Sequence, residues 1–276
     1  MPRIFEDDLT DRIIAAAIHV HRTLGSGLLE SAYEECFAIE LSARDLPFVR
    51  QLPLEIIYRE TRLTTRTYRL DFVVDSDVVI PCDVSDDASI DNAFEQLNQQ
   101  LGGLDVMAHS IAFAPVETFE NRFVDTSRQA FLTALDVSAY AMIAMARRAE
   151  PLMAARGGGS MVSLTYMASE RVFPKYNVMA TAKAALECSI RYLAYELGES
   201  HIRVNAISAG PVRTLAAKGI PGFSEMEEVI EQRSPLRQNI DSSDVGNAAL
   251  YLCSPLAAMV TGTTLYVDSG YHAMGM

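Results

Sequence analysis

The stretch LTYMASERVFPKYNVMATAKAALE, residues 164–187, carries the pattern that decides the fold. A strand ending near Tyr166 is followed by a loop and by a helix expected from Tyr176 to about Leu197. On that helix Tyr176 and Lys183 are seven residues apart, nearly two turns, so both project from one face. A nearby ammonium favours phenolate and should lower the pKa of the tyrosine. The pattern suits protonation of an enolate oxygen, although an amphipathic helix with one Tyr and one Lys explains the spacing equally well.

Composition narrows the class of protein. The chain has 276 residues, 49% hydrophobic and 21% charged, which is typical of one large or two small globular domains. A net charge of −13 argues against a generic binder of nucleic-acid phosphates. The four cysteines form no CxxC pair and the histidines no metal-ligand spacing, so we expect reduced thiols and no metal. No signal peptide and no apolar run of ~18 residues is evident, which indicates a cytoplasmic protein.

Strand-like and helix-like segments alternate from residue 78 onward. This alternation predicts a parallel, doubly wound sheet. Ligands of such sheets bind beyond the carboxyl ends of the strands, where Ser110, Tyr166 and Gly210 are expected. The expected strands are DVVIPCDV (77–84), GLDVMAHSIAF (103–113), SMVSLTY (160–166), IRVNAISAG (202–210) and TGTTLYVDSG (261–270), and the helices run up to Leu101, over Phe131–Arg156 and over Tyr176–Leu197.

Residues 1–77 follow a different pattern and are expected to form a separate domain from 78–276. An apolar helix start is expected over Asp11–Val20, an amphipathic helix within 24–46, and two strands over 49–58 and 67–75. The junction falls in an apolar run without a Gly, Ser or Pro spacer, which is an unusual position for a domain boundary.

Several strings of the second domain resemble one family. They are PCDVSDDASID (81–91), HSIAFAP (109–115), the 164–187 stretch, IRVNAISAGPVRTLAAKGI (202–220), DVGNAALYLCS (244–254) and VDSGYHAMGM (267–276). Together they resemble the NADH-dependent enoyl-acyl-carrier-protein reductases, divergent members of the short-chain dehydrogenase/reductase superfamily. The resemblance implies a Rossmann-like domain, NADH as cofactor, an acyl-carrier-protein-bound enoyl substrate, and assembly into homotetramers through helices that include the Phe131 and Tyr176 segments.

The same resemblance implies individual roles. Tyr176 corresponds to the catalytic tyrosine at the thioester carbonyl, Tyr166 to a second active-site tyrosine, and Lys183 to the lysine that holds the nicotinamide ribose. The implied cofactor contacts are Asp83 and Val84 beside the adenine, Ser110, Ile111 and Ala112 in the loop under the cofactor, and Gly210, Pro211, Val212, Arg213, Thr214, Leu215 and Ala216 along the segment reaching the carboxamide and pyrophosphate, with Ala114 at the substrate. His109 is interpreted as a core histidine bonded to backbone.

The first unit of the expected fold is missing. A dinucleotide-binding domain begins with a strand, a glycine-rich turn and a helix whose N-terminus meets the pyrophosphate. Gly25 and Gly27 follow a helix-like stretch, so they do not supply this context. The fold class expected is therefore α/β, an incomplete doubly wound sheet whose first βαβα unit is absent, preceded by an α+β fragment.

That fragment resembles the N-terminal half of the GxxExxY proteins, which are similar to PD-(D/E)xK nuclease-like folds. Gly27, Glu30 and Tyr33 match the naming motif, and Asp71 in RLDF matches the acid that begins a metal site. The Glu-x-Lys strand of that family is absent. Three functions stay open. The motifs favour an NADH-dependent enoyl-thioester reductase with impaired turnover. The alternatives are a nuclease-like or nucleic-acid-associated module and an inactive fusion protein.

Overall fold

The computed structural model describes residues 16, 19, 20, 23, 30–46, 48–54, 57–58, 61–62, 68–74, 80, 82–212 and 223–275. The chain divides into two compact units, Met1–Val79 and Ile80–Met276. The helix expected over Asp11–Val20 lies largely outside the described residues.

The described part of the first unit contains helix α2 (Glu30–Ala43), isolated helical residues (Ala16, His19, Val20 and Thr23) and short antiparallel strands. Strands β1 (Phe48–Leu54) and β4 (Tyr68–Val74) pair antiparallel, as do the two-residue strands β2 (Ile57–Tyr58) and β3 (Thr61–Arg62). A small cluster around buried Leu41 and Leu46 forms its core. The helix and the two long strands agree with the sequence prediction.

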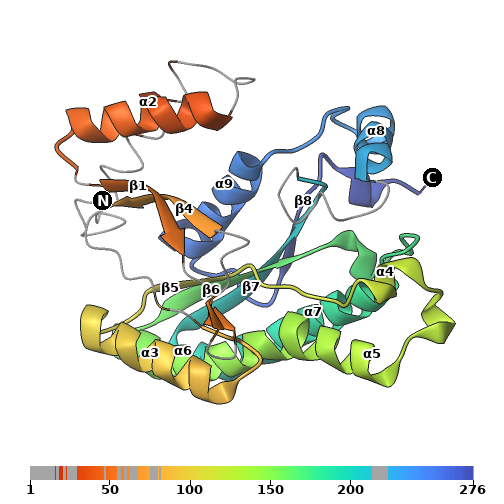
Figure 1. Ribbon diagram of the computed structural model, residues 1–276, viewed down its shortest axis with the longest axis horizontal. Coiled ribbons are helices and arrows are strands. Elements are labelled where there is room, and N and C mark those ends of the chain that lie inside the picture. Colours follow the sequence, from red (N-terminus) through yellow and green to blue (C-terminus); the bar gives the residue numbers. More distant parts are fainter. Residues whose placement is uncertain are drawn as a thin grey trace. The chain divides into compact units, whose positions relative to one another are not determined.

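The second unit is a Rossmann-like α/β fold built on a parallel four-stranded sheet (Figure 1). Its strands are β5 (Val106–His109), β6 (Gly159–Thr165), β7 (Ile202–Ala209) and β8 (Thr264–Val267), in the order β5-β6-β7-β8. The helices are α3 (Asp87–Leu101), α4 (Glu117–Glu120), α5 (Arg128–Leu135), α6 (Ala141–Ala154), α7 (Asn177–Leu197), α8 (Phe223–Arg233) and α9 (Ser242–Cys253).

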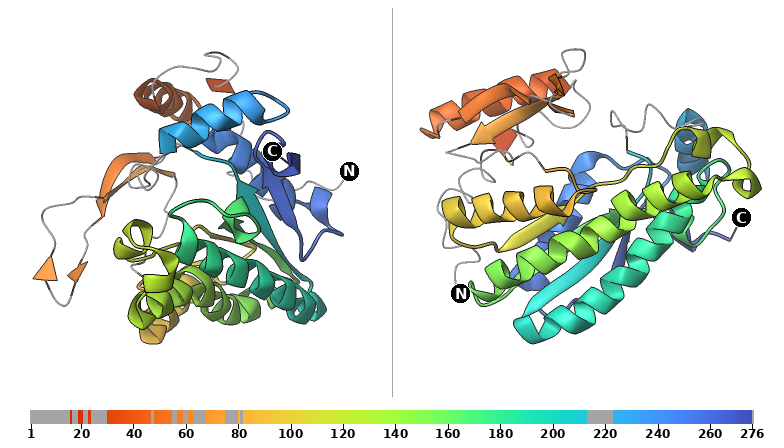
Figure 2. Two further views of the ribbon diagram at one scale, coloured as in Figure 1. Left: turned by 90° about the vertical axis from the view of Figure 1, so that its right-hand side faces the viewer. Right: turned by 60° about the horizontal axis from the view of Figure 1, so that its bottom comes forward.

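Helices cover the sheet on both faces. Helices α3, α6 and α7 lie along one face and α9 along the other, as the views in Figures 1 and 2 agree. The main core joins α3, α6 and α7 to the strands and includes the buried side chains of Met142, Met161, Leu186 and Ile202. A second cluster, with Val162, Ile207 and Leu252, lies beneath α9.

Local sequence fixes where the helices begin and end. The Asp86 side chain accepts a hydrogen bond from the Ala88 N–H at the start of α3, and Gly102 ends that helix in a left-handed conformation with φ of 68°. At α9, Asp241 and Asp244 form a reciprocal capping box. These caps satisfy backbone groups that have no partner within the helix.

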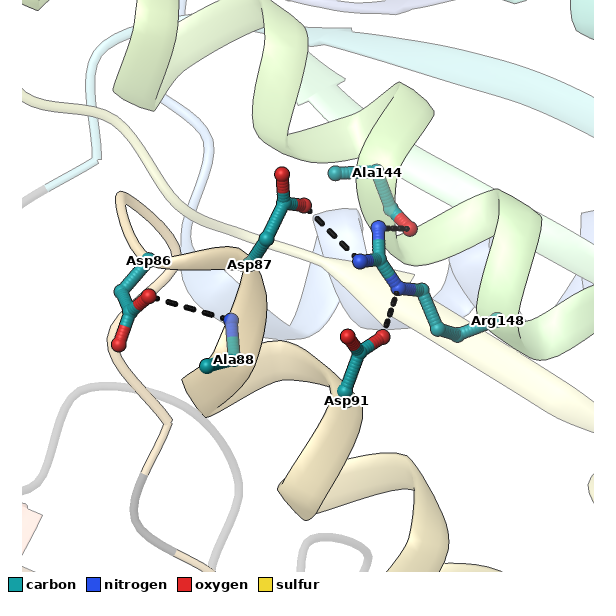
Figure 3. Close-up of polar contacts among 6 residues, drawn as sticks. All are labelled: Asp86, Asp87, Ala88, Asp91, Ala144 and Arg148. Carbon is teal, nitrogen blue, oxygen red and sulfur yellow. Dashed lines mark hydrogen bonds and ion pairs between the residues drawn. The ribbon is translucent and has the colours of Figure 1, made fainter.

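One arginine joins two helices on the same face of the sheet. The Arg148 guanidinium donates to Asp87 Oδ1 at 2.9 Å and to Asp91 Oδ1 at 2.7 Å, so α6 is held against the first turns of α3 (Figure 3). It also donates to the Ala144 carbonyl at 3.0 Å. Both carboxylates are exposed, so the arrangement orients the helices more than it stabilises the fold.

The longest helical segment contains a π turn. Residues Arg128–Ala154 run through α5, the π-helical η2 (Asp136–Tyr140) and α6, with a mean hydropathy of 1.3 in the most apolar window. By length and composition alone, the segment could cross a membrane. However, the core helix of a soluble protein meets the same criteria, and 44% of that window is buried within this protein. Length and hydropathy therefore do not identify a membrane span here.

Two features differ from the expected strand pattern. Ile80 and Cys82–Ser85 are not in a strand, although a strand was predicted over 77–84, and most of its remaining residues lie outside the described part. In the described sheet β5 has β6 as its only neighbour, with Met107 buried and Val106 37% exposed. The described sheet thus begins at β5, and no described strand occupies the place of the missing first unit.

Candidate active site

The expected site residues lie at one edge of the sheet. Because β5, β6 and β7 are parallel, their carboxyl ends meet there. Ser110 directly follows β5, Tyr166 follows β6 and Gly210 follows β7, as the sequence predicted. A Cβ atom on Gly210 would lie 3.3 Å from the Asp268 Cα, so glycine permits close approach of the chain ends after β7 and β8.

The two tyrosines are in direct contact. The rings of Tyr166 and Tyr176 meet edge to face, with centroids 5.4 Å apart and planes at 78°. Phe173 packs against Tyr166 at 5.0 Å, and Phe119 packs against Tyr176 at 6.0 Å. The Tyr166 hydroxyl lies 4.0 Å from the Met226 sulfur. The two tyrosines, ten residues apart in sequence, are therefore held as one aromatic pair by a residue of the loop between them and by Phe119 and Met226 from other segments.

Lys183 is buried beside the end of β6. Its Nζ donates to the Leu164 carbonyl oxygen at 2.8 Å, and the residue is only 6% exposed. Burial lowers the pKa of Lys183 to about 8, and the Glu187 carboxylate acts in the opposite direction. Glu187 itself accepts a 2.5 Å hydrogen bond from the Thr165 hydroxyl. An ammonium has three donors, so bonding to Leu164 leaves two for a ligand.

The phenols do not behave as the sequence interpretation expected. Burial raises the pKa of Tyr176 to about 12, and burial and nearby acidic groups also raise the pKa of Tyr166. The expected lowering was wrong for this structure, because loss of hydration alone accounts for the shifted pKa of Tyr176. Both hydroxyls therefore stay protonated at neutral pH and can act as hydrogen-bond donors.

The loop after β5 is fixed by a residue that the sequence did not single out. Ser138 Oγ accepts from the Phe113 N–H at 2.8 Å and donates to the Phe113 carbonyl at 2.9 Å. Ser138 is fully buried in the π turn η2, and Ala114 is buried next to this loop. Ser110 and Ala112 are exposed, so the loop presents an open surface at the strand ends.

His109, at the end of β5, is a buried histidine, as the sequence predicted. Its Nδ1 lies 2.9 Å from the Ser163 hydroxyl, so a side chain as well as backbone contacts this histidine. Burial, and secondarily the charge on Lys183, lower the pKa of His109 to about 4. Its Nε2 is buried and has no partner among the described residues.

A cavity of about 790 Å³ opens beside Tyr166. Apolar side chains supply most of its wall, including Phe173, Met226 and Ile230. Its full lining is Tyr166, Met167, Arg171, Val172, Phe173, Pro174, Lys175, Pro211, Met226, Val229, Ile230, Arg233, Tyr271, His272, Met274 and Gly275. A site of this size and composition can take a small acyl ligand.

The remaining predicted contacts are only partly described. Asp83 lies outside any helix or strand, and its carboxylate accepts from the Ser85 N–H and hydroxyl at 2.9 and 2.7 Å. Val84 forms part of the same turn. Pro211 and Val212 follow Gly210, whereas Arg213, Thr214, Leu215 and Ala216 lie outside the described residues, as do Gly27 and the side chains of Glu30, Tyr33 and Asp71. Among the described residues no group of His, Cys, Asp or Glu could hold a metal ion.

A parallel sheet with helices on both faces and polar side chains beyond the strand ends defines a Rossmann-like protein of the dinucleotide-binding class. Residues 54–272 match the family model described as enoyl-(acyl carrier protein) reductase. The chain therefore belongs to the enoyl-acyl-carrier-protein reductase family. The match begins at residue 54, within the 1–77 stretch that resembled a nuclease-like fragment.

Individual relatives agree with this assignment. The NADH-dependent enoyl-acyl-carrier-protein reductase FabI of Bacillus cereus is 48% identical over 198 residues, which are 72% of this chain and 77% of that protein. The crystal structure of the enoyl-acyl-carrier-protein reductase of Anaplasma phagocytophilum in complex with NAD is 50% identical, with a TM-score of 0.69 over 72% of this chain and 76% of that one. FabI of Candidatus Liberibacter asiaticus is 35% identical, with a TM-score of 0.70 over 96% of this chain and 92% of that one.

Proposed function

We propose that this protein reduces trans-2-enoyl thioesters carried by acyl carrier protein, with NADH as the hydride donor. The observation that carries the proposal is the contact between Tyr166 and Tyr176 at the carboxyl ends of the strands, with the Lys183 ammonium beside β6. Family membership supports the reaction class, and relatives are named for NADH. The roles of individual residues are our assignment.

The residues fit the electronic demands of the reaction. When bound, NADH supplies a hydride to the β-carbon, and negative charge then develops on the thioester oxygen. Tyr176, kept protonated by burial, donates a hydrogen bond to that oxygen and stabilises the enolate. A proton delivered to the α-carbon completes the saturated thioester. Tyr166 packs against the Tyr176 ring and limits its movement.

The nicotinamide half of the cofactor fits the described residues better than the phosphate half. Lys183 retains two donors for ribose hydroxyls, and Ser110 and Gly210 directly follow strands at the same edge of the sheet. The described part of Ile80–Met276 has no strand, glycine-rich turn and helix that could hold the pyrophosphate. Each missing charge-assisted hydrogen bond removes about 1.5–3 kcal/mol. We therefore propose weak NADH binding and impaired turnover.

A substitution series tests the proposal. The protein is supplied with crotonyl-CoA, and oxidation of NADH is followed by its loss of absorbance. We expect slow turnover that falls at least tenfold in Tyr176→Phe, which loses the donor to the enolate oxygen. Tyr192→Phe is a matched control, because Tyr192 lies on the same helix α7 but is 67% exposed. Equal rates in both variants, or no NADH binding by calorimetry, would refute the enzymatic proposal.

We also propose that the protein assembles as a homotetramer in the cytoplasm. Helices α5 and α7 expose large apolar or aromatic side chains, among them Leu132 and Tyr195. Exposed side chains of this kind are typical of interfaces between subunits. Light scattering after size-exclusion chromatography tests the assembly, and a monomeric mass would contradict it. The nuclease-like activity inferred from Glu30 and Asp71 stays a prediction, for which loss of DNA cleavage in Asp71→Ala is the test.

A further inference from the structure

A buried carboxylate fixes a histidine at the wall of the cavity. Asp268, 6% exposed, follows β8 and accepts hydrogen bonds from the Gly270 N–H at 3.0 Å and the His272 N–H at 2.8 Å. Its Oδ1 also lies 2.9 Å from the His272 Nδ1. Three contacts to one carboxylate hold the short turn η7 (Tyr271–Ala273) and the imidazole together.

The plane of the imidazole is fixed as well. The Tyr266 ring stacks on His272 with centroids 4.0 Å apart and planes 14° from parallel. The Tyr266 hydroxyl donates to Glu170 Oε1 at 2.9 Å, which in turn limits rotation of the tyrosine. His272 is therefore held both along its edge and across its face, a degree of restraint expected of a side chain that orients a ligand.

This restraint determines which ring nitrogen can accept a hydrogen bond. Because the Asp268 carboxylate accepts from Nδ1, neutral His272 carries its proton there and Nε2 keeps a lone pair. No partner of Nε2 is recorded in the part of the chain that the structure describes. His272 lines the same cavity as Tyr166 and Tyr271. The wall of the largely apolar cavity thus includes a histidine of fixed orientation whose Nε2 is a hydrogen-bond acceptor.

The chemistry of the substrate limits what this acceptor can bind. An enoyl thioester has a carbonyl oxygen, a sulfur and a carbon chain, none of which donates a hydrogen bond. The donors of a carrier-bound acyl group are in the pantetheine arm, which has amide N–H and hydroxyl groups. The two ends of the ligand thus need different partners. The thioester carbonyl needs a hydrogen-bond donor, which the tyrosines supply, and the pantetheine arm needs a hydrogen-bond acceptor.

We propose that His272 Nε2 accepts a hydrogen bond from an amide N–H of the pantetheine arm, and that Asp268 is the positioning residue that fixes the required tautomer. This inference rests on the proposed reductase function and adds a site for the non-reacting part of the substrate. Binding of the arm next to Tyr166 holds the enoyl group against the tyrosine pair. His272 then distinguishes carrier thioesters from simple thioesters of the same acyl group.

The test compares crotonyl-CoA, which contains the amide groups, with S-ethyl crotonothioate, which has no hydrogen-bond donor. His272→Phe keeps an aromatic ring to stack on Tyr266 and removes the acceptor. We expect its kcat/KM for crotonyl-CoA to fall about threefold to tenfold, mainly through KM, with no change for the ethyl thioester. The KM for NADH should also stay constant. Equal losses with both thioesters, no loss with either, or a raised KM for NADH would overturn the assignment.

Asp268→Asn provides a second test. An asparagine amide that donates to Nδ1 places the histidine proton on Nε2 and converts the acceptor into a donor. We expect the same loss confined to crotonyl-CoA, in protein whose melting shows that it is folded. If wild-type protein reduces neither thioester, the proposed function fails together with this inference. If wild-type protein is active and both variants keep its substrate preference, only the role of His272 is refuted.

Discussion

Replacing Lys183 with methionine should separate the function of the site from the stability of the fold. Burial lowers the pKa of this lysine from 10.5 to about 8. That decrease corresponds to about 3 kcal/mol of unfavourable free energy for keeping the ammonium charged in the folded protein at neutral pH. Methionine has a similar volume and no charge, but it forfeits the hydrogen bond to Leu164, which contributes about 1 kcal/mol. We therefore expect Lys183→Met to raise the free energy of unfolding by about 1–2 kcal/mol near neutral pH.

The sign of the pH dependence follows from the same pKa. Between about pH 8 and 10.5 the unfolded lysine is protonated and the folded one is not, so wild-type stability rises with pH in this window. From about pH 7 to about pH 9.5 the wild type should gain about 2 kcal/mol relative to Lys183→Met. The advantage of the variant should thus disappear at the higher pH.

Urea unfolding followed by far-ultraviolet circular dichroism at both pH values measures this difference. The same samples should show loss of NADH oxidation in Lys183→Met, since the ribose partner is gone. Lys175→Met is a matched control for stability, because Lys175 is an exposed lysine and its removal should change stability little at either pH. If Lys183→Met is destabilised by the same amount at both pH values, the attribution of the lowered pKa to burial is refuted.

Two further predictions concern the backbone. Gly158→Ala should destabilise the protein by about 2–5 kcal/mol, because Gly158 has φ of +131° and its Cβ would lie 2.5 Å from the His201 carbonyl oxygen. Gly198→Ala should be neutral or slightly stabilising, because Gly198 has φ of −59° and nothing lies within 4 Å of the added Cβ. Equal melting temperatures of Gly158→Ala and Gly198→Ala would contradict the predicted difference. Asp241→Ala should lower the free energy of unfolding by about 1–2 kcal/mol through loss of the α9 cap. Asp241→Ser should retain most of the stability. Identical unfolding curves for wild type and Asp241→Ala would show that the cap contributes nothing.

Local sequence signals predicted the parts of the fold that local interactions determine. Helix α7 was placed to within one residue, because its apolar spacing is regular. The positions of Ser110 and Gly210 followed from alternation of strands and helices alone. The strand expected over 77–84 was not found at Cys82–Ser85, where an Asp-Ser turn competes with extended backbone.

Properties that depend on three-dimensional burial could not be predicted from the local sequence. The pKa of Tyr176 was predicted in the wrong direction, because sequence spacing shows the ammonium but not the loss of water around the phenol. Ser138 fixes a loop 25 residues away and carries no local signal of that role. The Asp268–His272 pair did have a signal, an acid and a histidine four residues apart after a strand, but only the structure shows that the pair lines a cavity.

The chemical step and the retention of cofactor depend on different parts of this chain. The tyrosine pair, Lys183 and their supporting contacts all belong to Ile80–Met276, which is built around its own core. The described contacts that orient these side chains come from this second unit. Binding of the pyrophosphate needs hydrogen-bond donors that the described part of this unit lacks. Each hydrogen bond to the pyrophosphate changes the affinity for NADH but does not act on the enolate oxygen. Under the proposed function, we therefore expect a high KM for NADH, and we expect the tyrosine pair to stabilise the enolate once the cofactor is bound.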